Sequence, residues 1–167
     1  MKQILLIILI FFISYCIQGL DLPLDEETGK VTYSDIRKIE PMTKDELYAK
    51  TIEWFAYRFN SSNDVIQLAD KVKMKVIGKG NFKINFYAKN PVISFTISVF
   101  LKESRYKIII TDLKYKDKKG LEFIIHDDNF PKYWGGKKKL YNAVDIEIKS
   151  ILEDFFGYMN TPEDEDW

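Results

Sequence analysis

The sequence predicts a two-layer α+β domain in which two amphipathic helices cover one face of an antiparallel sheet. Apolar residues recur at helical spacing in two segments, at about 44–59 and about 138–158. Between these segments, apolar and polar residues alternate with a period of two, as in strands that bury one face and expose the other. The predicted order is strand, helix, four or five antiparallel strands, and a second helix.

The first predicted strand covers Val31–Ile39, which is rich in β-branched and aromatic residues, and Pro41 stops it. Thr43 and Glu46 then have the spacing of a capping box, so a helix is expected from about Lys44 to Phe59. Its apolar face is predicted to contain Leu47, Tyr48, Ile52, Phe55, Ala56 and Phe59.

Short alternating segments follow this helix. Val65, Ile66 and Leu68 predict a short strand, and 74–86 alternates apolar residues with lysines. Gly78 and Gly80 interrupt this alternation, and we expect a bulge or a tight bend there.

The next strands are predicted at 93–101 and from Tyr106 onward, joined by a turn at 102–105. Leu113 and Tyr115 fall on the opposite parity from Ile110, which predicts a bulge near Thr111 or Asp112. A short edge strand at 121–125 is expected to end at the polar residues 127–131.

The last helix is expected from Lys138 or Lys139 to Tyr158. Three lysines at a helix start oppose the macrodipole, so Lys137 and Lys138 are expected to precede the first turn. Asp145, Glu147, Glu153 and Asp154 are expected on its outer side. The predicted buried face consists of Leu140, Tyr141, Val144, Ile148, Ile151, Leu152, Phe155 and Met159.

Residues 1–19 are typical of a secretory signal peptide: Lys2 precedes an apolar run from Ile4 to Ile13, and small residues follow it. We therefore expect an exported, periplasmic or secreted protein, with cleavage after Cys16 or Gly19. A retained anchor is a weaker alternative. Lipidation of Cys16 is disfavoured because Tyr15 precedes it. We expect residues 20–29 to form a flexible acidic lead-in and residues 161–167 to form an acidic tail. Residues 30–160 between them are expected to form a single domain.

Composition excludes several classes of protein. One Cys and one His cannot form an internal disulfide or a zinc site of four thiolate or imidazole ligands. The 25 basic and 25 acidic residues give no net charge. Because both ends are acidic, residues 30–160 contain 24 bases and 17 acids, so the central domain is basic.

Motifs for catalysis are weak in this sequence. No phosphate-binding loop or nucleophile elbow is present, and no cofactor or metal is expected. His126 beside Asp127 and Asp128 offers the single His–carboxylate combination, and an enzyme with a site here near Trp134 is an alternative hypothesis.

The candidate binding residues are lysines. Strand parity places Lys73, Lys75, Lys79, Lys83, Lys102 and Lys107 on the sheet face away from the helices. Such a face attracts anions, although lysines along a strand also serve as its solvated side. The aromatic loop 129–136, which includes Trp134, is either a plug over the core or a lip that binds a partner.

Four segments support a family resemblance: 42–48 with its capped helix start, 54–62 ending in Asn-Ser-Ser, 65–67 with Val-Ile-Gln, and 77–82 with Gly-Lys-Gly-Asn-Phe. From about Val31 to Tyr115 the chain resembles domain of unknown function family 4468, which has a TATA-binding-protein-like (TBP-like) fold and occurs mainly in exported proteins of Bacteroidota. The resemblance implies a curved sheet backed by helices. It implies no catalytic residues, and an exported chain is not expected to bind nucleic acid.

The sequence thus favours a non-enzymatic binding module at the cell envelope, using the lysine face or the aromatic loop. The expected partner is an anionic envelope component or another protein, with membrane contact only through the leader. A purely structural module is the remaining alternative, and a convex or obstructed sheet face would indicate it.

Overall fold

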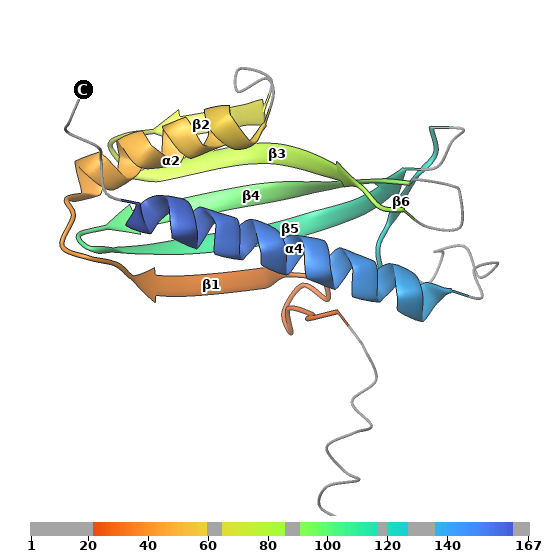
Figure 1. Cartoon of the computed structure of the whole chain (residues 1–167). Coiled ribbons are helices and arrows are strands. Elements are labelled where there is room, and N and C mark those ends of the chain that lie inside the picture. Colours follow the sequence, from red (N-terminus) through yellow and green to blue (C-terminus); the bar gives the residue numbers. More distant parts are fainter. Residues whose placement is uncertain (1–21, 60–64, 86–90, 117–119, 127–135, 162–167) are drawn as a thin grey trace, which may run out of the picture.

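The computed structural model describes residues 22–59, 65–85, 91–116, 120–126 and 136–161. A six-stranded antiparallel sheet forms one layer, and helices α2 (Lys44–Arg58) and α4 (Lys137–Asn160) form the other (Figure 1). This is the two-layer α+β architecture that the sequence predicts. The strands are β1 (Tyr33–Lys38), β2 (Ile66–Asp70), β3 (Lys75–Lys83), β4 (Val92–Lys102), β5 (Arg105–Lys116) and β6 (Glu122–Ile124).

The strands lie in the order β1-β5-β4-β3-β2, and β6 pairs with the part of β5 that β1 does not reach. The long hairpin β4–β5 forms the centre of the sheet, because its strands have 11 and 12 residues. The turn between them holds Ser104 at a φ of 53°. Sequence alternation located this hairpin correctly because buried and partly exposed residues alternate along both strands.

The bulge predicted near Thr111 or Asp112 is confirmed. The β4–β5 register shifts between Ser94 and Thr96, and Asp112 has a φ of 55°. One extra residue in β5 therefore returns Leu113 and Tyr115 to the buried face.

The bulge predicted at Gly78 and Gly80 is wrong for β3. Both glycines pair with β4 in an unbroken register, and the irregularity lies instead in β2, between Ile66 and Leu68. A Cβ on Gly78 would lie 2.4 Å from Cε1 of Phe55. Gly78 therefore makes room for the ring of Phe55 on α2, and Gly80 makes room for the rings of Phe95 on β4 and Phe59 at the end of α2.

Helix α2 begins with the predicted capping box: Thr43 Oγ1 accepts from the Glu46 amide at 3.2 Å, and Glu46 accepts from the Thr43 amide at 2.7 Å. Its buried face differs from the prediction, because Ala56 is exposed whereas Trp54 is fully buried. Indole Nε1 of Trp54 donates to Asp154 of α4 at 2.8 Å. A polar partner on the second helix thus allows the large ring to enter the core.

Helix α4 starts at Lys137, one or two residues earlier than expected, so all three lysines lie within its first turn and the expectation that Lys137 and Lys138 precede that turn is wrong. The eight residues predicted for its apolar face are all buried. The acidic residues on its outer side are not simply solvated. Asp145 accepts from Tyr33 at 3.1 Å, and Glu153 forms an ion pair with Arg37.

Residues 22–29 were expected to be a flexible lead-in, but they pack against the domain. Leu22 belongs to the core at 3% exposure, and Leu24 forms a β-bridge with Val31. Asp25 accepts from the amide and the hydroxyl of Thr28, at 2.8 and 2.7 Å, which closes the turn between them. Residues 22–29 therefore belong to the folded domain.

Candidate functional site: the open face of the sheet

Both helices lie on the same side of the sheet, and no element in the described part of the chain covers the other side (Figure 1). We call this other side the open face. Strand register defines its residues, because partners directly opposite in neighbouring strands point to the same side. Its main residues are Ile36, Leu68, Asp70, Lys75, Ile77, Lys79, Lys83, Ser94, Thr96, Ser98, Phe100, Lys102, Arg105, Lys107, Ile109, Thr111, Lys114 and Glu122.

Five of the six predicted lysines lie on the open face: Lys75, Lys79, Lys83, Lys102 and Lys107. Lys73 does not, because it lies in the turn between β2 and β3, where its amine is 3.8 Å from the Asp70 carboxylate. Trp134, the remaining candidate, and the rest of the aromatic loop up to residue 135 lie outside the described residues.

The lysines of the open face are largely uncompensated. Among the described residues, Lys79, Lys83, Lys102 and Lys107 form no ion pair. The Lys75 amine lies 5.0 Å from the centre of the Phe100 ring, a cation–π distance. The face therefore has a positive potential that its own acids do not cancel.

One hollow of about 400 Å³ lies at the end of the face formed by the β4–β5 hairpin. Strand register explains its composition. Lys107 of β5 lies between Phe100 of β4 on one side and Ile36 of β1 on the other, and Lys102 of β4 lies opposite Arg105 of β5. The residues that line it are Ile36, Phe100, Lys102, Arg105, Tyr106, Lys107 and Ile109. An apolar floor thus has cations around it.

A second hollow of about 500 Å³ lies nearer the other end and is more polar. Both acids of this hollow form ion pairs. The Glu122 carboxylate lies 3.6 Å from the Lys114 amine, and the Asp112 carboxylate lies 2.7 Å from the Lys30 amine. The residues that line it are Lys79, Ser94, Phe95, Thr96, Asp112, Lys114 and Glu122.

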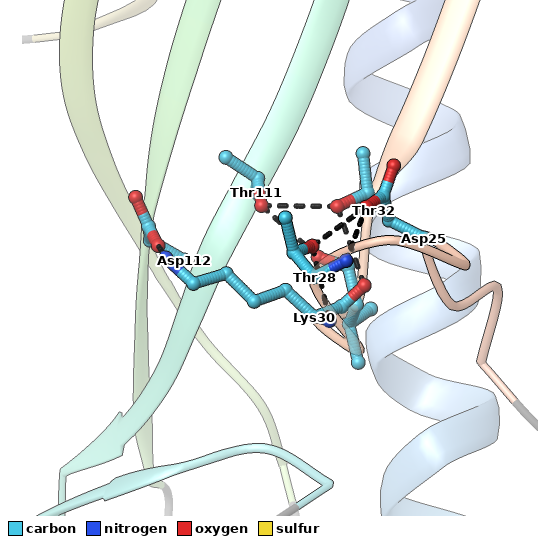
Figure 2. Close-up of polar contacts among 7 residues, drawn as sticks. Asp25, Thr28, Lys30, Thr32, Thr111 and Asp112 are labelled. Carbon is cyan, nitrogen blue, oxygen red and sulfur yellow. Dashed lines mark hydrogen bonds and ion pairs between the residues drawn. The ribbon is translucent and has the colours of Figure 1, made fainter.

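The N-terminal turn holds the wall of the second hollow in place. Figure 2 shows Lys30 reaching from this turn to Asp112, and the Thr32 hydroxyl meeting the Thr111 hydroxyl at 3.1 Å. Thr111 also donates to the carbonyl of Val31 at 3.3 Å. These contacts fix the β5 bulge where Asp112 adopts its left-handed backbone. The Asp112 carboxylate, in turn, raises the pKa of Lys30.

The region around His126 has a different character. His126 has a φ of 78°, its Nδ1 is buried without a hydrogen-bond partner among the described residues, and its ring lies 6.2 Å from that of Tyr141. Asp127, Asp128 and Trp134, its supposed partners, lie outside the described residues. Within the described ranges, no group of three or more His, Cys, Asp or Glu side chains is placed to hold a metal ion.

Sequence reasoning missed the apolar part of the open face. Phe100 alternates with the buried Val99 and Leu101, so its outward orientation could have been read from the same pattern that located the lysines. Ile36, at 66% exposure, gave no such signal, because the β1 sequence lacks a clear period.

Comparison with known proteins identifies the family. The family model described as "Domain of unknown function (DUF4468) with TBP-like fold" matches residues 33–116, half of the chain. The chain belongs to this family. The DUF4468 match covers β1 to β5 and α2, and therefore includes most of the open face.

Solved structures agree on the fold. A TBP-like protein from Parabacteroides distasonis superposes with a TM-score of 0.69 and 20% identity, covering 80% of this chain and 95% of that one. A DUF4468 family protein from Bacteroides ovatus has a TM-score of 0.69 and 17% identity, and the match covers 86% of this chain and 94% of that protein. At these identities the likeness shows the TBP-like fold alone. No curated protein matches the sequence significantly. No helix in the described ranges has the length and apolar character to cross a membrane.

Proposed function

We propose that this DUF4468 protein is a non-enzymatic binding module at the cell envelope and that its open face holds an anionic partner. The observation that carries the proposal is a sheet face left uncovered by the described elements, on which four lysines have no acid partner among the described residues. Unpaired cations on an accessible surface attract an anion over roughly a Debye length, about 8 Å at physiological salt.

The lysines are spread along the sheet. Lys102 lies at one end of β4, and Lys83 lies opposite Val92 at the other end. A strand rises about 3.3 Å per residue, so these two ends are separated by roughly 30 Å. This separation favours an extended anionic component of the envelope, and an acidic segment of another protein is the alternative partner.

The location in the envelope is proposed from residues 1–19, which have the pattern of a secretory signal peptide. Leu22, the first residue that the structure describes, is buried in the core and follows both expected cleavage positions, so cleavage at either position would leave the described domain intact. We therefore propose that the domain is periplasmic or secreted, without a lipid on Cys16, and that only the leader contacts the membrane.

The test is capture of partners from an envelope extract by the purified chain. Lys79→Glu/Lys83→Glu reverses two unpaired cations of the open face. Lys44→Glu/Lys138→Glu makes the same charge change on exposed residues in the first turns of α2 and α4, where an acid favours the helix. We expect the open-face variant to lose the captured anion and the helix-layer variant to retain it. Equal capture by the wild type and the open-face variant would refute the proposal.

A further inference from the structure

We propose that the hollow at the β4–β5 hairpin end of the open face binds a small amphipathic organic anion, in which one carboxylate, sulfate or sulfonate head joins an apolar body. The inference rests on the proposed function, because the hollow belongs to the same face. It adds a ligand class that a charge-only surface would not select.

The floor of the hollow supplies the apolar half of the site. Phe100, Ile109 and Ile36 come from three neighbouring strands, β4, β5 and β1. Ile36 is 66% exposed, and Phe100 and Ile109 are only partly buried, although all three lie on an ordered sheet. Covering such area removes apolar surface from water, at about 25 cal/mol per Å². The floor therefore favours a ligand with an apolar body over an inorganic ion.

The rim supplies the cationic half. Lys102 and Arg105 lie directly opposite each other, and Lys107 is two positions further along β5. None of the three has an ion pair with a described acid. Glu103, in the turn between the first two, instead accepts from the backbone amide of Lys44 at 3.3 Å, which directs it to the helix layer. The guanidinium of Arg105 can thus offer its paired N–H donors to a carboxylate or sulfonate.

The size of the hollow limits the ligand. Its volume of about 400 Å³ lies within the range of small-molecule sites. The hollow is bounded by three strands and the hairpin turn, so a compact ring system or a medium alkyl chain matches it better than a polymer does. Charge complementarity fixes the sign of the head group, since the described residues of the lining include three cations and no acid.

The test is a fluorescence titration of the purified chain with anilinonaphthalene sulfonate, followed by competition with dodecanoate and with acetate. Dodecanoate has both the head and the apolar body, whereas acetate has only the head. We expect saturable binding that dodecanoate displaces and acetate does not. We expect two variants to bind the probe about fivefold more weakly or worse than the wild type. One is the double variant Lys102→Gln/Arg105→Gln, and the other is Ile36→Ser.

Two matched variants serve as controls on the same face. Lys79→Gln/Lys83→Gln removes two cations outside the hollow, and Leu68→Ser removes an aliphatic side chain that is 43% exposed there. Both should bind the probe within about twofold of the wild type. Equal loss in hollow and control variants, or equal displacement by acetate and dodecanoate, would overturn the inference.

Failure here is distinct from failure of the proposed function. If the hollow variants bind the probe like the wild type while Lys79→Glu/Lys83→Glu abolishes envelope capture, the small-anion site is wrong and the binding face stands. If the hollow variants lose the probe while Lys79→Glu/Lys83→Glu captures normally, the small-anion site stands and the proposed envelope function falls.

Discussion

The ring of Phe55 on α2 lies directly over Gly78 of β3, so close that a methyl group on Gly78 would come within 2.4 Å of the ring edge. Contacts of this length do not occur between real side chains, so any side chain at Gly78 must displace the Phe55 ring or the helix that carries it. This glycine therefore allows the Phe55 ring to lie directly over β3 at this point.

Gly78→Ala is expected to destabilise the domain by about 2 kcal/mol through overpacking. Denaturant unfolding of the purified variant measures this loss. Gly157→Ala is the control, because Gly157 lies on the exposed side of α4 with open space around it. An alanine there should stabilise the helix by about 0.5–1 kcal/mol. Phe55→Leu should partly rescue Gly78→Ala, and strict additivity of the two losses would contradict the steric explanation.

The hydrogen bond from Trp54 to Asp154 links the two helices. Asp154→Ala leaves the indole N–H of a fully buried ring without its acceptor and should cost about 1–3 kcal/mol of unfolding free energy. Asp154→Asn keeps an acceptor oxygen, so its loss should be clearly smaller. Arg58 lies 3.6 Å from the same carboxylate, and Arg58→Gln controls for that ion pair. Equal losses in the Ala and Asn variants would show that the hydrogen bond contributes little.

Acid is expected to destabilise the chain through three exposed carboxylates. Thr43 lowers the pKa of Glu46, Thr28 lowers that of Asp25, and Arg37 lowers that of Glu153. Each folded-state pKa lies below its unfolded value, so the stabilisation is complete above the unfolded pKa and is lost as pH falls through the folded pKa. The ordinary values are 4.5 for Glu and 3.8 for Asp, which places the loss below about pH 4.5.

Glu46→Gln isolates one of these contributions. Glutamine also accepts a hydrogen bond in a capping box but does not titrate, so the variant should lose stability less steeply than the wild type between about pH 5 and pH 3. Thr43→Ala, which removes the cap at any pH, should cost about 1 kcal/mol at neutral pH. Unfolding curves across this pH range measure both effects, and an unchanged acid slope in Glu46→Gln would contradict the assignment.

Leu22 anchors the N-terminal end of the described domain. Leu22 is 3% exposed in the core, so Leu22→Ala should lose about 2 kcal/mol. Leu24→Ala should lose less than about 0.5 kcal/mol, because Leu24 is 42% exposed. If the leader is removed on export, as we propose, mass spectrometry of the processed chain should find its N-terminus at or upstream of Leu22. A processed chain that begins after Leu22 would contradict the packing described above.

The sequence predicted most of the elements because periodicity is a local property. Alternation located β4 and β5, and helical spacing gave all eight buried residues of α4. The change of parity after Ile110 even placed the bulge at Asp112. The same alternation placed five of the six candidate lysines on one face, although Lys73 lies in a turn, where strand parity no longer applies.

Other features depend on which segments meet across the fold. The sequence alone determined the element types and the basic character of the central domain, because each follows from neighbouring residues in the chain. Tertiary structure decided that Gly78 lies under the ring of Phe55 and that the buried Trp54 donates a hydrogen bond to Asp154. It also decided that Ile36, Phe100 and Arg105 line one hollow. Those contacts join residues from different strands and helices, and only strand order and register bring them together.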